Sequence, residues 1–571
     1  MKRILVLSLV MFCAVFSGQA QEKVWVFFTD KGTNVEESLA HPEKLLSSEA
    51  LARRAEKGLS VDIHDVPVHG DYLDILNEFE LEVLSTSRWL NAAAVSVKAE
   101  CIDELNKLCF VNGLQPIQTL IESHEEEEIE YPLYVETAYA QALTADDDMP
   151  FEYGEAELQN TMINVHSLHK KGYTGKGVRM AIFDSGFDAV DTIAAFDSLW
   201  ANNQIIHWYD FVDKDTTLFR EDAHGTQVLS TIGANIPGEM IGTAPHATFI
   251  LCRTEDSGSE THQEEHNWVA AMEWVDSVGV DVIHSSLGYS EFDEGEGDYT
   301  YEEMDGNTAV ITKAADRAAA KGILVTTSAG NQGDETWKYI TAPCDGDSVL
   351  CVGAVTKSLK RARFSSFGPA SDGRIKPDVV ALGQNSTVAS PSNYVTNRNG
   401  TSFSGPIIAG MVACVRQAHP KRSNMDIIKA IQLSCDQYAL PDDEYGYGIP
   451  DAGMADSLLA NVKDLSTVKI EMEAKPIRGK QPAKKKEIVF TDSPKSAVNV
   501  SGTTLTVSTK ESGATILNVQ LMRGTQKVFL RNQDYFISDD EASFDIGILL
   551  DGDHYVNIKT TDYEENVKFS R

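Results

Sequence analysis

Three side chains that lie far apart in the sequence could together create a reactive hydroxyl. Ser402 stands between small residues in the segment 399–406, directly before an apolar run with helical spacing, so we expect it in the first turn of a helix. The free backbone N–H groups and the dipole of a helix start favour a developing negative charge. A short turn of this kind is also ordinary helix-cap chemistry, so the assignment depends on other residues.

A serine hydroxyl needs a base, and the base needs a carboxylate that fixes its tautomer. Asp184 ends the apolar run 178–183, which is typical of a buried parallel strand, and open α/β sheets place functional groups at the carboxyl ends of strands. His224 directly precedes a second run with helical spacing. Such a site loses activity when its histidine is protonated, around an unperturbed pKa of about 6.5.

Asn331 is a candidate for stabilising the transition state. It follows the apolar run 323–325, again where a strand would pass into a loop. Its amide could donate to the oxyanion of a tetrahedral intermediate together with the backbone N–H of Ser402. The loss of one such donor typically costs about 10²–10³ in turnover.

The carboxylate, histidine and serine follow one another in the order found in subtilisins, and no Gly-x-Ser-x-Gly elbow of the α/β-hydrolase type occurs. Further short motifs run collinearly from about residue 155 to 458: Ser286-Leu287-Gly288, Ala329-Gly330-Asn331 and Gly400-Thr401-Ser402. The sequence resembles the subtilisin-like serine peptidases, of the secreted bacterial type with an N-terminal propeptide. The resemblance implies a serine endopeptidase with Asp184, His224 and Ser402 as catalytic triad, Asn331 as oxyanion donor and no required cofactor.

The same resemblance implies where a peptide substrate binds. Ser286, Leu287 and Gly288 would pair with the substrate backbone, because an extended edge can bind a peptide as an added strand. Ala329 and Gly330 would supply the facing wall. The alternative for the first segment is a simple buried strand end. The pocket floor is expected near residues 337–341.

The fold class expected is α/β, with a subtilisin-like, mostly parallel sheet flanked by helices. An α+β propeptide domain precedes it and a C-terminal β-sandwich follows it. The expected boundaries are a signal peptide at 1–20, the propeptide-like domain at 21–120, an acidic linker at 121–154, the catalytic domain at 155–465, and a basic linker with the sandwich at 466–571. Strands are expected at 178–183, 205–209, 247–252, 280–285, 323–327 and 349–355, and helices at 225–234, 266–278, 308–321, 403–418 and 424–435.

Within the N-terminal domain, residues 46–57 should form a helix with Arg53 and Arg54 facing outward. The resemblance implies that this domain is the protein's own propeptide, which assists folding and acts as an intramolecular inhibitor. An independent binding domain is the alternative. The acidic linker keeps itself extended by charge repulsion and would suit proteolytic processing, although a plain tether would look the same.

Composition and the first residues predict where the protein acts. The formal net charge of −37 argues against nucleic acid or anionic membrane surfaces as partners. Lys2 and Arg3 precede a short apolar run and small residues, the pattern of a secretory signal. No later stretch has eighteen consecutive apolar residues, so we expect no transmembrane segment and a soluble exported protein, located outside the cell, at its surface or in the periplasm. Protein or peptide substrates are the expected partners.

The cysteines allow two short bridges in an oxidising compartment. Cys101 is close in sequence to Cys109, and Cys344 is close to Cys351. The alternative is that all four are buried thiols. Cys252, Cys414 and Cys435 lie in apolar patterns and are expected as core thiols.

The sequence also allows other interpretations of the function. A catalytically silent binding protein could use the same fold, although all four catalytic positions are filled. His262 and His266 match an inverted zinc-peptidase pattern, but no third ligand is identifiable, and no metal site is predicted there. The acidic insertion at 291–305 could rim the cleft, where it could bind calcium or favour basic substrates.

Overall fold

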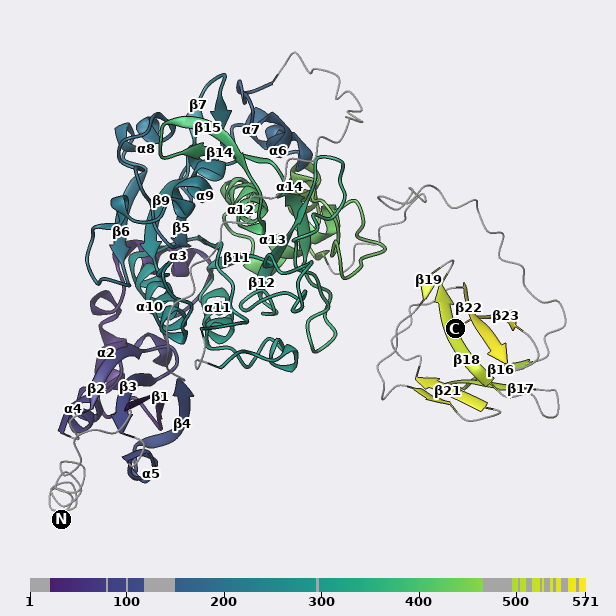
Figure 1. The fold of residues 1–571 in the computed structure, drawn as a ribbon, viewed down its shortest axis with the longest axis horizontal. Coiled ribbons are helices and arrows are strands. Elements are labelled where there is room, and N and C mark those ends of the chain that lie inside the picture. Colours follow the sequence, from purple (N-terminus) through teal and green to yellow (C-terminus); the bar gives the residue numbers. More distant parts are fainter. Residues whose placement is uncertain are drawn as a thin grey trace. The chain divides into compact units, whose positions relative to one another are not determined.

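The computed structural model describes residues 21–78, 81–98, 101–117, 149–293 and 297–465, and the strands of the segment 496–570. The chain divides into two compact units, Met1–Ala474 and Lys475–Arg571, which are described separately (Figure 1). The expected signal peptide, most of the acidic linker and the basic linker lie outside the described residues.

A seven-stranded sheet forms the centre of the first unit, in the order β13-β12-β11-β10-β5-β9-β6. Every neighbouring pair of strands is parallel. The strands are β5 (Arg179–Asp184), β6 (Ile205–Asp210), β9 (Thr248–Arg253), β10 (Val282–Ser285), β11 (Leu324–Ser328), β12 (Val349–Val355) and β13 (Val379–Leu382). The predicted parallel α/β fold is confirmed, and β13 is an additional strand.

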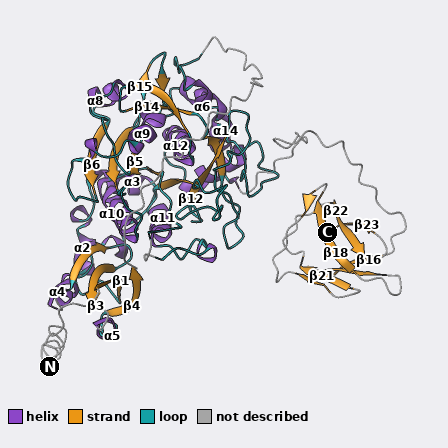
Figure 2. Cartoon of the chain, in the orientation of Figure 1, coloured by secondary structure: helices purple, strands orange, loops and turns teal. Residues whose placement is uncertain are grey.

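Helices cover both faces of this sheet (Figure 2). Successive side chains of a strand point to opposite faces, and β5 follows this rule. Met180 and Ile182 belong to the core that contains α9 (His224–Gly233) and α12 (Thr401–Ala418), whereas Ala181 and Phe183 belong to the core of α10 (His262–Val278) and α11 (Val310–Ala320). The near-continuous apolar runs seen in the sequence therefore reflect strands that are buried on both sides.

The helix α12 runs through the interior of the first unit, and its residues 401–416 are all buried. A helix that is apolar on every side must lie inside the protein. Smaller elements surround this framework: α6 (Glu157–Met162), α7 (His166–Lys170), α8 (Asp197–Ala201), α13 (Asn424–Ser434), α14 (Ala452–Asn461), β7 (Asn235–Ile236), β8 (Met240–Ile241) and the hairpin of β14 (Ser386–Ser390) and β15 (Tyr394–Arg398).

The N-terminal residues form an antiparallel sheet in the order β2-β3-β1-β4, with short helices. Its elements are β1 (Gln21–Phe28), α2 (Val35–Ala40), α3 (Ser48–Glu56), α4 (Gly70–Glu78), β2 (Glu82–Ser87), β3 (Ala92–Lys98), α5 (Ile102–Leu105) and β4 (Val111–Ile117). This is the expected small α+β domain, and α3 matches the helix predicted at 46–57.

The expectation that Arg53 and Arg54 face outward is wrong. Both side chains are buried, and both bind Asp276 of α10, Arg53 at 2.8 Å and Arg54 at 2.5 Å. Arg54 also pairs with Asp65 of its own domain at 2.7 Å. The helix period alone could not reveal this contact, because the partner carboxylate lies more than 200 residues away in the sequence.

A second carboxylate of α10 forms hydrogen bonds with the turn between β2 and β3. Glu273 accepts hydrogen bonds from the hydroxyl of Ser87 at 2.5 Å and from the backbone N–H groups of Arg88 and Trp89, each at 3.0 Å. Burial raises the pKa of Glu273, while the bonds from Ser87 and its neighbours oppose the shift. One face of α10 is therefore covered by the N-terminal domain.

The C-terminal unit contains two four-stranded antiparallel sheets, ordered β16-β17-β21-β20 and β19-β18-β22-β23. Strands of the two sheets contact each other, β16 with β23 and β18 with β21. The strands are β16 (Ser496–Ser501), β17 (Thr504–Thr509), β18 (Ile516–Arg523), β19 (Gln526–Lys527), β20 (Tyr535–Ile537), β21 (Glu541–Asp545), β22 (Asp553–Thr560) and β23 (Glu564–Ser570). The predicted all-β character of this region is confirmed.

One of the two short cysteine pairs forms a disulfide. Cys344 is bonded to Cys351, which places a bridge at the start of β12. Cys101 and Cys109 are not joined to each other. The three thiols expected in the core, those of Cys252, Cys414 and Cys435, are buried.

The buried ion pairs between α3 and α10 predict how firmly the N-terminal domain is held. We expect Asp276→Ala to weaken its attachment by about 3–5 kcal/mol, because removing one member of a buried pair leaves the other charge uncompensated. Amide hydrogen exchange of residues 48–56, measured in the full chain, should become faster. Glu104→Gln, which removes the exposed pair with Lys107, is the control and should leave this exchange unchanged. Equal exchange of α3 in the Asp276→Ala protein and the parent would contradict the prediction.

Candidate active site

Asp184 is the last residue of β5, and its side chain is fully buried. The strand order changes direction at β5, with β9 and β6 on one side and β10 to β13 on the other. Functional sites of open parallel sheets lie at such a switch point, outside the carboxyl ends of the strands. Its Oδ1 accepts a hydrogen bond from the backbone N–H of Ser185 at 2.9 Å, which fixes the carboxylate at the strand end.

His224 is the first residue of α9, and its Nδ1 donates to Asp184 Oδ1 at 2.7 Å. The backbone N–H of His224 donates to Asp222 Oδ1 at 2.6 Å, which holds the start of the helix. A Cβ on Gly225 would lie 2.3 Å from the carbonyl oxygen of Gly186 and 2.8 Å from Asp184 Cβ. Glycine is therefore required next to the histidine, because only its backbone can approach the end of β5 so closely.

The carboxylate controls the charge of the histidine. Burial disfavours the protonated ring, but the charge of Asp184 and its hydrogen bond favour that form more strongly and raise the pKa of His224 to about 9. The side chain is 32% exposed, so water screens part of this interaction. Because only the neutral ring can accept a proton, the pH range in which His224 can act as a base begins above the ordinary value of about 6.5.

Ser402 is the second residue of α12, with 5% of its surface exposed. Its hydroxyl donates to the backbone carbonyl of Ser286 at 3.3 Å, and no hydrogen bond joins it to His224 among the described residues. The imidazole of His224 lies over the same turn of α12, with its ring centroid 5.7 Å from that of Phe403. The structure therefore brings the three predicted residues to one place, with the serine hydroxyl directed to Ser286.

Asn331 follows the carboxyl end of β11 and faces the start of α12. Its Oδ1 accepts hydrogen bonds from the backbone N–H of Thr401 at 2.9 Å and from the hydroxyl of Thr401 at 3.0 Å. These two bonds assign the oxygen of the amide, so the Nδ2 group is the one left to donate elsewhere. Thr401 is a positioning residue that the sequence analysis did not identify as such.

The two predicted walls of a substrate cleft approach each other through Thr341. A Cβ on Gly288 would lie 2.2 Å from Thr341 Oγ1, and one on Gly330 would lie 3.1 Å from Thr341 Cγ2. The N–H of Thr341 also donates to the carbonyl of Ala329 at 3.3 Å. Leu287 is buried with 7% of its surface exposed. Of the segment 337–341, Thr341 is thus the residue that lies between the walls.

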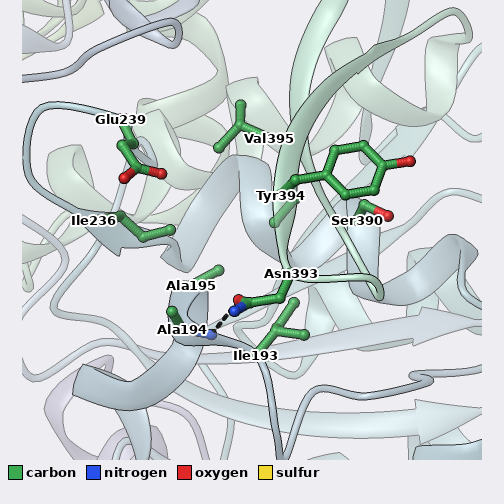
Figure 3. A pocket seen from close by; sticks show the side chains of 10 residues that line it. Ile193, Ala194, Ala195, Ile236, Glu239, Ser390, Asn393, Tyr394 and Val395 are labelled. Atoms are coloured by element: carbon green, nitrogen blue, oxygen red, sulfur yellow. Dashed lines mark hydrogen bonds between the residues drawn. The ribbon is translucent and has the colours of Figure 1, made fainter.

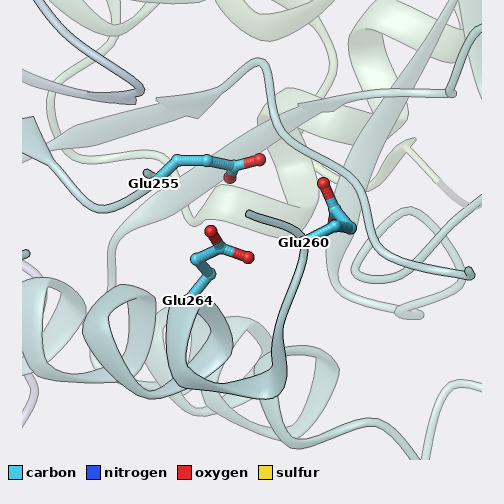
Figure 4. Close-up of side chains that lie close together, drawn as sticks. All are labelled: Glu255, Glu260 and Glu264. Carbon is cyan, nitrogen blue, oxygen red and sulfur yellow. The ribbon is translucent and has the colours of Figure 1, made fainter. Parts of the chain in front are cut away.

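Three glutamates gather beside this cleft and were not singled out from the sequence. Carboxylate oxygens of Glu255, Glu260 and Glu264 lie within 4.8 Å of one another, and Figure 4 shows the carboxyl groups turned toward a common point. Burial, together with the charge of Glu255, raises the pKa of Glu264. Tyr289, which follows Gly288, donates to Glu255 Oε2 at 2.8 Å. A donor set of carboxylate oxygens suits a hard cation such as calcium.

The acidic insertion at 291–305 adjoins this cluster but does not supply its carboxylates. The N–H of Asp293 donates to the carbonyl of Glu260 at 2.9 Å, and the N–H of Glu260 donates to Asp293 Oδ2 at 3.1 Å. The candidate cation site therefore lies in the loop after β9 and at the start of α10. It precedes in sequence the segment 291–305, where the sequence suggested a calcium site.

His262 and His266 are engaged in other contacts. The Nδ1 of His262 lies 2.6 Å from Glu265 Oε2, and the ring of His266 packs edge-on against Trp25 of β1 at 4.7 Å. Burial lowers the pKa of His266 to about 3. Within the described part of the chain, these histidines do not belong to a group of three or more potential metal ligands. Their contacts support the packing of α10 and give no support to a zinc site.

A separate pocket of about 180 Å³ lies between the hairpin β14–β15 and the segment 193–195 (Figure 3). The side chain of Asn393 closes one side of it, because its Oδ1 accepts the N–H of Ala194 at 2.8 Å. The residues that line this pocket include none of the predicted catalytic or substrate-binding residues. The pocket is therefore not the candidate active site.

Comparisons of the sequence with known proteins find related chains. A model of the subtilase family matches residues 175–448, and a model described as the peptidase S8 propeptide domain of Bacteroidota matches residues 23–130. Subtilisin of Bacillus pumilus is 30% identical over 293 residues, which are 51% of this chain and 94% of that protein. Subtilisin DY of Bacillus licheniformis is 31% identical over 266 residues, 46% of this chain and 85% of the other. Subtilisin E of Bacillus subtilis is 28% identical over 358 residues, 62% of this chain and 78% of the other.

The contact between Asp184 and His224 predicts the titration of the imidazole. In a Ser402→Ala protein, which retains both residues, NMR should find the pKa of His224 above 6.5 and toward 9. Asp184→Asn should lower this pKa, because the favourable charge is lost while the burial remains. His246 is a half-buried histidine outside the site and should titrate alike in both proteins. A pKa of His224 at or below 6.5 before the Asp184 substitution would contradict the prediction.

Proposed function

Because the chain belongs to the subtilase family of serine peptidases, we propose that it is an exported endopeptidase that cleaves peptide bonds through Asp184, His224 and Ser402. The observation that carries the proposal is the 2.7 Å hydrogen bond between Asp184 and His224 beside the hydroxyl at the start of α12. A carboxylate that holds Nδ1 leaves Nε2 of the same ring as the base.

Ser402 acts as the nucleophile in this proposal. In the structure its hydroxyl is held by the carbonyl of Ser286. A substrate N–H that pairs with this carbonyl displaces the hydroxyl, which then turns to Nε2 of His224. His224 takes the proton as Ser402 Oγ attacks the peptide carbonyl, and later gives it to the leaving amine. Asp184 stabilises the imidazolium in between.

Asn331 and the backbone N–H of Ser402 are the proposed donors to the oxyanion. The bonds from Thr401 fix the Asn331 amide so that Nδ2 is the available donor. The N–H of Ser402 lies in the first turn of α12, where the helix supplies no carbonyl four residues earlier and its dipole favours negative charge. Donors fixed before the reaction stabilise the developing charge without reorganisation.

Protein or peptide substrates would bind in extended form between the segments 286–288 and 329–330. Main-chain pairing of this kind gives affinity with little dependence on sequence, and the pocket beside the scissile bond sets the preference. The net charge of −37 disfavours polyanionic partners such as nucleic acid. Calcium, where bound, would be held by Glu255, Glu260 and Glu264 and would neutralise their mutual repulsion.

The N-terminal domain is proposed as the inhibitor of its own catalytic domain. Its family match to a peptidase propeptide supports a zymogen. The contacts of Arg53, Arg54 and the 87–89 turn with α10 supply the binding surface. We propose the domain boundaries given by the sequence, with a propeptide at 21–120, a processing linker at 121–154, a catalytic domain at 155–465, and a C-terminal region at 466–571.

Export is proposed from the signal-like pattern of the first twenty residues. None of the helices among the described residues combines the length and the apolar character needed to cross a membrane. We propose that the exported protein is extracellular, located at the cell surface, or periplasmic.

A direct chemical test separates an active peptidase from a silent binding protein on the same fold. An irreversible fluorophosphonate should label the processed protein, and Ser402→Ala should abolish labelling and reduce peptide turnover by roughly 10⁴–10⁶. Ser404→Ala, which removes a buried hydroxyl two residues further along α12, is the matched control and should remain labelled. A Ser402→Ala protein with full activity would refute the assignment of the nucleophile.

Self-processing gives a second test. When the full chain is produced without other peptidases, we expect the parent protein to lose residues 21–150 and the Ser402→Ala protein to keep them, because the cleavage needs the chain's own nucleophile. Mass spectrometry of both proteins after incubation measures the outcome. Loss of the segment from the isolated Ser402→Ala protein would show that the cleavage does not depend on this site.

A further inference from the structure

A buried histidine lies directly behind the proposed nucleophile. His284 is on β10, in the interior of the sheet, and none of its surface is exposed. Its Nδ1 lies 3.0 Å from Thr326 Oγ1 and its Nε2 lies 2.9 Å from Ser286 Oγ. A Cβ on Gly405 of α12 would lie 2.7 Å from the Cε1 of this ring, so glycine allows the helix to rest on the imidazole.

The hydroxyl of Ser286 replaces a backbone donor that Pro406 removes from α12. Pro406 lies inside α12. A proline has no N–H, so the carbonyl of the residue four positions earlier, Ser402, lacks its helical partner. The hydroxyl of Ser286 donates to this carbonyl at 3.0 Å. One side chain thus satisfies the backbone group that the helix itself leaves open at the proposed nucleophile.

A count of protons assigns the role of His284. A serine hydroxyl has one proton, and that of Ser286 is directed to the Ser402 carbonyl. The contact between Ser286 Oγ and His284 Nε2 therefore requires Nε2 to be the donor. Burial lowers the pKa of His284 to about 3, so the ring is neutral. Nδ1 must then accept the proton of the Thr326 hydroxyl, which otherwise goes to the carbonyl of Ile283 at 3.0 Å.

The opposite tautomer would have a direct cost at the active site. With the proton on Nδ1, the ring would donate to Thr326 Oγ1, whose own proton would go to the carbonyl of Ile283 at 3.0 Å. Nε2 would then accept the proton of Ser286, and the carbonyl of Ser402 would lose its donor. The carbonyl of Ile283 can spare the Thr326 proton, because β10 is paired with β5 and β11 and the strand ladder supplies its donor. The carbonyl of Ser402 has no helical donor, and a buried carbonyl without a partner is unfavourable, so the arrangement with the proton on Nε2 is the stable one.

We propose that His284 is a positioning residue for the peptidase reaction, whose Nε2–H holds the Ser286 hydroxyl on the carbonyl of Ser402 and thereby fixes the turn that carries the nucleophile. The inference rests on the proposed role of Ser402. It concerns the orientation of the nucleophile and not substrate binding, because the proposed pairing with substrate uses the backbone of Ser286 and not its hydroxyl.

Steady-state kinetics of the processed enzyme on a peptide substrate test this role. His284→Leu should lower kcat by about three- to tenfold, the worth of one lost hydrogen bond, with KM within about twofold of the parent. His284→Gln, which places an amide N–H at the position of Nε2, should recover most of kcat. Ser286→Ala should lower kcat to the same degree. The double variant His284→Leu/Ser286→Ala should have a kcat no lower than that of Ser286→Ala, because both substitutions remove one shared interaction.

The control is a buried histidine without a contact to Ser286. His169 is bonded to Tyr153 and to the carbonyl of Thr243, and His169→Leu should lower the Tm while kcat stays unchanged. Multiplicative losses in the double variant, or equal kcat in the Leu and Gln variants, would assign His284 a merely structural part and overturn the proposal. Should His284→Leu fail to fold, an unchanged kcat in Ser286→Ala would overturn it equally. Failure of the parent to react with fluorophosphonate would instead defeat the proposed function itself.

Discussion

The hydrogen bond between Asp184 and His224 depends on a close approach that few backbones permit. The carboxylate ends β5 and the histidine begins α9, so a strand end and a helix start must lie in contact. Gly186 and Gly225 make that contact possible, since a Cβ on either would overlap backbone atoms of the facing segment. A parallel sheet brings the carboxyl ends of all its strands to one edge, and this is why Ser286 after β10 and Asn331 after β11 both contact the start of α12.

The helix α12 combines two conflicting demands. Its start must present the backbone N–H of Ser402 to the proposed oxyanion, and its body must be buried on every side. Burial normally requires that every backbone carbonyl has a donor. Pro406 removes one donor near the start, and the hydroxyl groups of Ser286 and Ser328 reach in from neighbouring segments to the carbonyls of Ser402 and Thr401. The first turn of α12 is thus held by side chains of the sheet as well as by its own hydrogen bonds.

The sequence predicted those parts of the structure that depend on local pattern. The strands β5, β6, β9, β10, β11 and β12 are apolar runs, and the residues gathered at the candidate site end such runs or begin helices. The prediction failed where a partner far away in the chain decides the outcome. The helical pattern predicted Arg53 and Arg54 on an exposed face, yet both side chains are buried in ion pairs with Asp276. The cluster of Glu255, Glu260 and Glu264 likewise arises only when the loop after β9 folds back onto α10. His284 reads as one more residue of a buried strand, and only the position of Pro406 and the contact with Ser286 give it a further meaning.

The helix α10 links the N-terminal domain to the candidate site. Trp268 packs against Phe183 of β5 and donates to the hydroxyl of Ser285 at 3.0 Å, so the inner side of the helix supports the strands that end at the site. The outer side presents Glu273 and Asp276 to the N-terminal domain. A buried ion pair adds little net stability, because both charges lose their hydration, although removing only one of the two partners is costly. Such an interface fixes a partner in one orientation, and its carboxylates become well solvated once the partner has gone. The same interface also contains apolar contacts, since Trp25 and Trp89 of the N-terminal domain share one buried cluster with Met272 of α10. The charged groups on α10 fix the geometry of docking and the apolar contacts add buried area, which suits the removable inhibitor that we propose for the N-terminal domain.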